Sequence, residues 1–127
     1  MADEERFERG LAVVEKLWGS RQGLPPSPGD PENAKDLQRL ITEHCFSDSW
    51  SRPGLELKTK SMLTIAILTT LGAGAELRGH VMGALNIGVT KEEIVELFIH
   101  TAAYAGIPRT VAAFGIAREA FGALEKK

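Results

Sequence analysis

Residues 76–108 read ELRGHVMGALNIGVTKEEIVELFIHTAAYAGIP, and this stretch encodes two successive helices. Gly88 ends the first helix. The run Thr90–Glu93 (TKEE) has the form of a capping box, in which the threonine oxygen accepts from the glutamate amide and the glutamate side chain reaches back. The second helix therefore starts at Lys91, is apolar around more than one face, and is broken by Gly106–Pro108.

The rest of the chain continues the helical pattern on both sides of this stretch. Residues 19–31 hold four of the six prolines and predict an exposed connector, and the polar, aromatic segment 47–52 follows a helix. No alternating strand pattern or hairpin signal occurs, so the fold class is all-α with about six helices. The expected helices are residues 4–18, 33–45, 57–71, 75–87, 91–105 and 109–124.

Length and composition limit the classes of function. The 127 residues suffice for one domain with a core and not for two, so we expect a single domain over residues 1–127. A net charge of −2 and the lack of a basic, aromatic surface argue against nucleic acid as a partner. The acidic start, MADEERFERG, and the absence of ~18 consecutive apolar residues predict a cytoplasmic protein with no membrane partner.

Two of the expected helices are too apolar to be covered by so short a chain. Residues 57–71 are apolar on most sides after Lys60, and residues 91–105 are apolar around more than one face. Such helices need cover on several sides, and partner subunits are the economical source of that cover. The sequence therefore predicts a homo-oligomer.

His80 is the leading candidate for catalysis, because imidazole is the side chain best suited to exchange a proton near neutral pH. Gly79 and Gly83 flank it at a cost of ~1 kcal/mol each in helix stability, which indicates close packing or room for a ligand. The alternative for His80 is a structural histidine between packed helices. Glu76, one turn earlier, orients the imidazole or raises its pKa, or is an exposed first-turn glutamate. His100 is more typical of a structural or subunit-contact histidine, and its role stays open.

Three arginines are candidates for binding an anionic substrate, because a guanidinium donates two parallel hydrogen bonds to a carboxylate. Arg52 is the strongest of them, since it follows Trp50 and precedes Pro53 in an ordered loop. Arg78 is a weaker candidate, and the role of Arg109 stays open. Trp50 belongs to the same substrate site or serves packing.

The single cysteine, Cys45, has no partner for a disulfide within the chain, and no Cys-x-x-Cys pair occurs for metal or dithiol chemistry. Its neighbour His44 suggests an activated nucleophile. Adjacent residues of a helix point in different directions, so an inert buried thiol is the preferred interpretation.

Taken together, the motifs of this chain resemble those of the carboxymuconolactone decarboxylase family, and their order and spacing carry the resemblance. They are Arg6–Gly10 (RFERG), Trp50–Leu55 (WSRPGL), Lys60–Ile65 (KSMLTI), Glu76–His80 (ELRGH), Gly88–Thr90 (GVT) with Glu93 and Ile94, and Tyr104–Pro108 (YAGIP). The resemblance implies an AhpD-like helical domain assembled as a trimer or hexamer, and an enzyme without a metal or organic cofactor. The AhpD-like peroxidases use a Cys-x-x-Cys before the equivalent histidine. Residues 72–79 contain no cysteine, so dithiol peroxidase chemistry is ruled out.

The activity that the resemblance implies is decarboxylation of a small carboxylated, unsaturated lactone such as 4-carboxymuconolactone, in aromatic catabolism. The lactone carbonyl accepts the electrons of the breaking bond, so no cofactor is needed. On this hypothesis His80 supplies a proton or stabilises the dienolate, Glu76 sets the imidazole, and Arg52 anchors a carboxylate, with Arg78 as the weaker anchor.

Some positions depart from the family pattern and bear on the substrate more than on the fold. Ile87 stands where asparagine is frequent, and Arg109–Val111 replace smaller residues. Two alternatives to the decarboxylase stay open. One is a non-catalytic oligomeric scaffold, and the other is an AhpD-like redox protein that uses Cys45 with a thiol partner.

Overall fold

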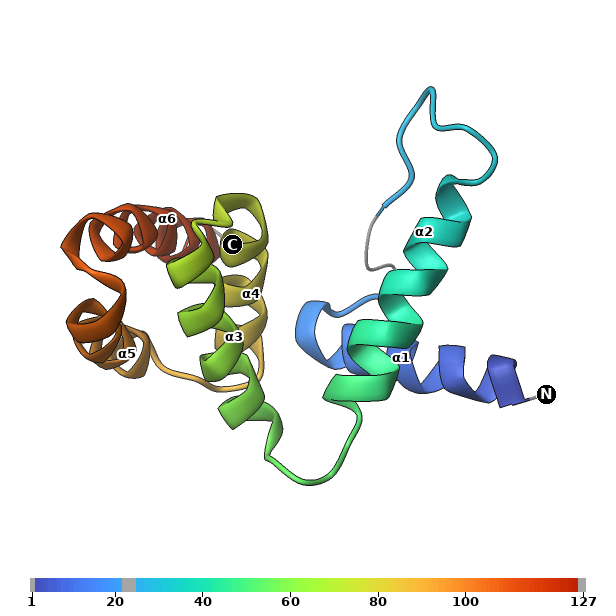
Figure 1. The fold of residues 1–127 in the computed structure, drawn as a ribbon, viewed down its shortest axis with the longest axis horizontal. Coiled ribbons are helices and arrows are strands. Elements are labelled where there is room, and N and C mark those ends of the chain that lie inside the picture. The colour runs from blue at the N-terminus through green and yellow to red at the C-terminus, as the bar shows by residue number, and fades with distance from the viewer. Residues whose placement is uncertain (1, 22–24, 126–127) are drawn as a thin grey trace. The chain divides into compact units, whose positions relative to one another are not determined.

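The computed structural model describes residues 2–21 and 25–125, which contain helices and no strand (Figure 1). This confirms the all-α fold class. None of the helices in these ranges combines the length and hydrophobicity needed to cross a lipid bilayer. The elements are α1 (Ala2–Trp18), α2 (Ala34–Ile41), the π-helix η1 (Thr42–Trp50), α3 (Leu57–Leu71), α4 (Gly74–Asn86), α5 (Lys91–Ala105) and α6 (Ile107–Glu125).

The chain divides into two compact units, one up to Leu55 and one from Glu56 onward. The first contains α1, α2 and η1, and the second contains α3 to α6 (Figure 1). A single domain over residues 1–127 stays a prediction.

In the first unit α1 packs against η1. Its buried side chains include Val14 and Leu17, both with no exposed surface, as the spacing of apolar residues predicts. Trp18 meets Phe46 of η1 edge to face, with ring centroids 5.7 Å apart. A Cβ at Gly10 would lie 2.5 Å from the carbonyl oxygen of Thr42, so the glycine allows the two helices to approach closely.

The prediction that the helix ends near residue 45 and a polar segment follows is wrong. The helix continues from α2 into η1 as far as Trp50. One face of η1 is buried and carries Phe46, Ser47 and Trp50. The polar composition of this segment does not indicate that face. Thr42 donates its hydroxyl to the carbonyl of Gln38 at 2.9 Å, which satisfies one buried polar group within the helix.

In the second unit α3 and α6 each contact the other three helices, so the predicted central place of α3 is shared with α6. Alanines of α6 let that helix approach the others closely, because a short side chain keeps the helix axes near one another. The buried core consists of Ile65, Leu77, Val81, Ala84, Val89, Ile94, Phe98, Ala113, Ala117 and Ala120.

The end of α3 and the start of α5 carry the caps that the sequence predicts. Gly72 caps α3 in the left-handed conformation (φ 72°), and its N–H and that of Ala73 donate to carbonyls of the last turn. At Thr90 the Glu93 amide donates to the threonine oxygen at 3.0 Å, and the Thr90 amide donates to the Glu93 carboxylate at 2.9 Å. The capping box is therefore confirmed.

The last helix begins earlier than the sequence predicts. Gly106 (φ 95°) alone ends α5, and α6 starts at Ile107 instead of Arg109. Pro108 thus lies in the first turn of α6, where a missing N–H costs no intrahelical hydrogen bond. The prediction that Pro108 breaks the helix is therefore wrong.

Candidate active site

Helix α4 has two faces with different characters. The face directed at the core is apolar and carries Leu77, Val81 and Ala84. A second face repeats at three- and four-residue intervals and therefore forms a stripe along the helix. Its members are Glu76, Gly79, His80 and Gly83. This stripe brings an acid, an imidazole and two residues without side chains onto one side of one helix.

Burial dominates the chemistry of His80. It lowers the pKa of His80 from 6.5 to about 4, and the carboxylate of Glu76 acts in the opposite direction with a smaller effect. Its Nδ1 atom is enclosed by protein. The resting imidazole is therefore neutral at pH 7 and lies in surroundings that disfavour a charge.

The position next to His80 on α4 is open. A Cβ built on Gly79 would meet no atom of the described residues within 4 Å. Gly79 thus serves no close approach of backbones in that part of the chain, and of the two explanations for this glycine the structure favours room beside the helix. Gly83, one turn further, is buried.

The arginines that the sequence singles out lie in different places. Arg78 is exposed on α4, two residues from His80. Arg52 belongs to the first unit, where its amide donates to the Ser49 carbonyl at 3.2 Å and its side chain is exposed. The roles of both as carboxylate anchors stay predictions.

Trp50 and Cys45 belong to the packing of the first unit. Trp50 is 7% exposed, and its ring lies 6.0 Å from that of Phe46. Burial raises the pKa of the Cys45 thiol, which a side-chain hydrogen bond with Trp50 opposes with a smaller effect. Since the thiolate is the nucleophilic form, the first unit leaves Cys45 less reactive than a free cysteine.

His100 lies in the second unit on the exposed side of α5, with its ring 5.6 Å from the ring of Tyr104. It borders a largely apolar hollow of about 600 Å³ between α3 and α5, together with Glu96 and Met62. Within residues 2–21 and 25–125, His, Cys, Asp and Glu side chains form no group of three that could hold a metal ion.

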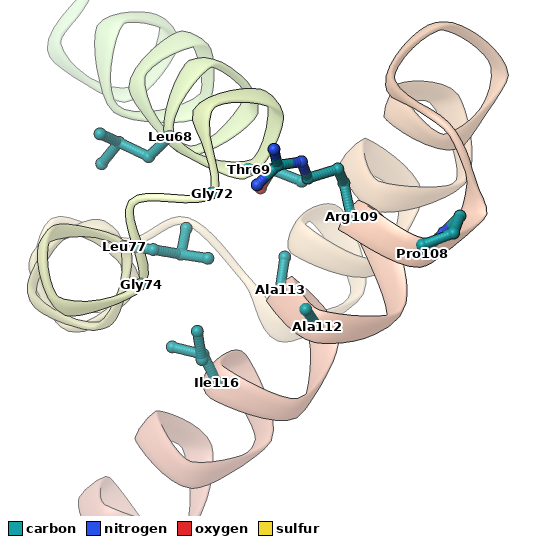
Figure 2. Close-up of a pocket in the computed structure, with 10 residues that line it drawn as sticks. All are labelled: Leu68, Thr69, Gly72, Gly74, Leu77, Pro108, Arg109, Ala112, Ala113 and Ile116. Carbon is teal, nitrogen blue, oxygen red and sulfur yellow. The ribbon is translucent and has the colours of Figure 1, made fainter.

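A second hollow, of about 350 Å³, lies where α3 ends and α6 begins (Figure 2). Arg109 stands at its edge with its guanidinium over Gly72, a placement that the sequence did not indicate. His80 lines neither of these two hollows.

The all-helical second unit thus carries a partly buried histidine one turn after a glutamate, an arrangement suited to acid–base chemistry. The chain belongs to the carboxymuconolactone decarboxylase family, whose model matches residues 35–119. The resemblance seen in the sequence motifs is thereby confirmed.

Two relatives with assigned activities are similar over most of the chain. The 4-carboxymuconolactone decarboxylase of Acinetobacter baylyi is 39% identical over 121 residues, which cover 95% of this chain and 90% of that protein. The nitrosuccinic acid decarboxylase of Metarhizium robertsii is 36% identical over 107 residues, which cover 84% of this chain and 75% of that protein.

Proposed function

We propose that this chain is a cofactor-independent carboxy-lyase that removes CO₂ from a carboxylated unsaturated lactone of the 4-carboxymuconolactone type. The observation that carries the proposal is the partly buried, neutral His80 on the same face of α4 as Glu76. Membership of the decarboxylase family and the similarity to a 4-carboxymuconolactone decarboxylase over nearly the whole chain support it.

The substrates in the names of the two relatives share one chemical property. Loss of CO₂ from a carboxylated unsaturated lactone leaves a dienolate, and loss of CO₂ from the carbon that bears the nitro group of nitrosuccinic acid leaves a nitronate. Both anions are stabilised by an oxygen within the substrate. The family scaffold therefore needs to supply a proton and an environment for a delocalised anion, and an electron sink is already present in the substrate.

The proposed reaction has two steps, loss of CO₂ and protonation of the resulting anion. The bond between the ring carbon and its carboxylate breaks, CO₂ departs, and the electron pair moves through the conjugated ring onto the lactone carbonyl oxygen. The resulting dienolate then takes one proton on carbon. One proton is consumed for each CO₂ released, and it comes from solvent by way of the protein.

We assign the delivery of that proton to His80. A neutral resting imidazole cannot act as a strong acid, but a bound substrate carboxylate beside it favours the charged form and raises its pKa. His80 therefore takes up a proton together with the anionic substrate and gives it to the dienolate. Glu76, whose charge already raises the pKa of His80, orients the ring and assists this uptake.

Arg52 of the first unit and Arg78 of the second unit stay the proposed anchors for the carboxylates, and Trp50, which is buried in the packing of the first unit, stays a prediction as an apolar contact. Both guanidinium groups are exposed, which suits residues that meet an anionic substrate from solution. Arg78 is the weaker candidate, because it lies two residues before His80 on α4, and side chains at that spacing point to different sides of a helix.

The test of the proposed function is CO₂ release from 4-carboxymuconolactone by purified wild-type protein and two variants. His80→Gln removes the acid, and we expect turnover to fall by about 100-fold or more, the usual contribution of general acid catalysis. His100→Gln changes the exposed histidine of α5 and is the matched control, with turnover near that of the wild type. Full turnover by His80→Gln would remove the assignment.

We further propose that the protein is a homo-oligomer, a trimer or a hexamer, acting in the cytoplasm. Helix α3 presents a second apolar stripe away from the core, and Leu63, Ile67 and Leu71 on it are 48%, 57% and 67% exposed. Surfaces of this kind mark contacts with other protein chains.

The two alternatives from the sequence receive less support. Redox chemistry depends on Cys45, whose thiol is partly buried and has a raised pKa. Alkylation of Cys45 tests this alternative, because CO₂ release should survive it. A non-catalytic scaffold would not need a neutral imidazole with space beside it, and it predicts no CO₂ release at all.

A further inference from the structure

The hollow at the start of α6 is built from three helices of the second unit and is apolar over most of its wall (Figure 2). The last turn of α3, the first turn of α4 and the first turns of α6 surround it. Its volume, about 350 Å³, lies within the range of small-molecule sites. The apolar wall is formed by Leu68, Leu77, Ala112, Ala113 and Ile116.

One guanidinium group stands at the edge of this wall. Nη1 of Arg109 lies 1.8 Å from the place that a Cβ of residue 72 would take, and Cζ lies 3.0 Å from that place. The absence of a side chain at Gly72 therefore leaves room for the guanidinium. Gly72 adopts the left-handed conformation (φ 72°) and caps the end of α3. Figure 2 shows the Arg109 side chain extending from α6 across to Gly72.

Arg109 has no carboxylate partner among the described residues, in contrast to Arg6 and Arg39, which form ion pairs in the first unit. It is also the one charged side chain among the lining residues of the hollow. A guanidinium at the edge of an apolar wall binds a carboxylate through two parallel hydrogen bonds while the wall takes up the rest of the ligand.

We propose that this hollow binds a monocarboxylate with a compact apolar body, such as an aromatic acid. The carboxylate pairs with Arg109, and the ring lies on Ala112, Ala113 and Leu77. The ligand carries one charge, because a second carboxylate would meet apolar side chains without a cation. The site is separate from the proposed catalytic histidine, since His80 does not line it.

Isothermal titration calorimetry with benzoate tests the site, with benzamide as the neutral isostere and inorganic phosphate as an anion without an apolar body. We expect saturable benzoate binding to the wild type, and binding at least tenfold weaker for benzamide and for phosphate. Equal affinity for phosphate and benzoate would overturn the proposed ligand class, and the absence of saturable benzoate binding would overturn the site.

Variants then locate the binding. Arg109→Gln should weaken benzoate binding about tenfold or more, to the level of benzamide. Arg118→Gln is the matched control, because Arg118 lies on the same helix with its guanidinium over the Phe114 ring, and benzoate affinity should be unchanged. Equal losses in both variants, or no loss in Arg109→Gln, would contradict the proposal.

A second variant keeps the test independent of any structural role of Arg109 at the end of α3. Ala112→Phe fills the hollow from an exposed position of α6 and leaves the guanidinium in place. It should abolish benzoate binding while the helical circular dichroism signal is retained, and undiminished binding would contradict the site. His80→Gln should bind benzoate as the wild type does, so failure of this site and failure of the decarboxylase proposal are distinguishable.

Discussion

At the scale of single residues, burial and the Glu76 carboxylate act on His80 in opposite directions, and burial has the larger effect. A histidine with a pKa near 4 is an uncharged imidazole at pH 7 and not a general acid, so the acidic proton must arrive with the substrate. This couples substrate binding to proton uptake. The sequence could predict the candidate imidazole and its acidic neighbour from their spacing, but it could not predict the charge state, which depends on burial by residues distant in the chain.

The lowered pKa of His80 makes stability depend on pH. The unfolded chain binds a proton at His80 below about pH 6.5, and the folded protein binds it only near pH 4. The unfolded state therefore holds more protons in this window, and stability falls as the pH drops from 6.5 toward 4. Urea unfolding at pH 7.5 and pH 5 should show a larger acid-induced loss for the wild type than for His80→Gln.

The comparison with His80→Gln removes the contribution of other titrating groups. Asp48 and Glu93 have lowered pKa values because of the Arg6 side chain and the Thr90 cap, respectively, and both carboxylates are present in either protein. Identical acid-induced losses in the two proteins would show that His80 is not shielded from water.

Gly79→Ala separates helix stability from ligand space. Alanine is more favourable than glycine in a helix interior by about 1 kcal/mol, and the new methyl meets no described atom within 4 Å. We expect the free energy of unfolding to rise by about 0.5–1 kcal/mol. If the space beside His80 receives substrate, kcat/KM for the lactone should fall about tenfold, since a misplacement of about 1 Å can cost more than this.

The matched control for Gly79→Ala is Gly115→Ala on α6, where a Cβ also meets nothing within 4 Å. It should gain similar stability and keep full activity. Unchanged kcat/KM in Gly79→Ala would show that the space beside His80 does not receive the substrate.

At the scale of helices, the ends were predictable where one residue carries a specific conformation. Gly72, Gly88 and Gly106 adopt positive φ angles at the ends of α3, α4 and α5, and the cap at Thr90 follows from four residues of sequence. The extension through η1 was not predictable in this way. Its buried positions contact α1, which lies some 30 residues away in the chain, so local pattern was overridden by packing.

Removal of the cap tests the start of α5. Thr90→Ala loses the hydrogen bond from the Glu93 amide, and the free energy of unfolding should fall by about 1 kcal/mol. Glu92→Ala is the control, because Glu92 lies in the same first turn and takes no part in the capping box. Its effect on urea unfolding should be smaller, and equal effects of the two variants would argue against the cap.

At the scale of the whole molecule, α3 is apolar on two opposite faces. Ile65 and Thr69 lie in the core of the second unit, and Ile67 lies on the outer stripe. If subunits cover this stripe, Ile67→Lys should reduce the mass measured by light scattering from that of a trimer or hexamer to that of a smaller species. Lys58→Gln, at an exposed position of the same helix on the side opposite Ile67, should leave the mass unchanged. A monomeric wild type would contradict the proposed assembly.

The family was predictable from the order of short motifs along the chain, and its fold class followed from helical periodicity. The contact between the Arg109 guanidinium and Gly72 was not predictable, because these two residues are 37 positions apart in the sequence. The anchors Arg52 and Arg78 stay predictions for a similar reason, since exposure alone does not determine which of them meets a substrate.

The protonation state of His80 is the most direct test of its role as the proton donor. The chain has three histidines, so proton NMR of the imidazole signals, with His80→Gln to assign one of them, follows His80 alone. The probe is a saturated γ-lactone that carries two carboxylates and cannot decarboxylate. We predict titration near pH 4 in the free protein and a protonated His80 at pH 7 in the complex. An imidazole that stays neutral at pH 7 with the lactone bound would contradict its role as the proton donor.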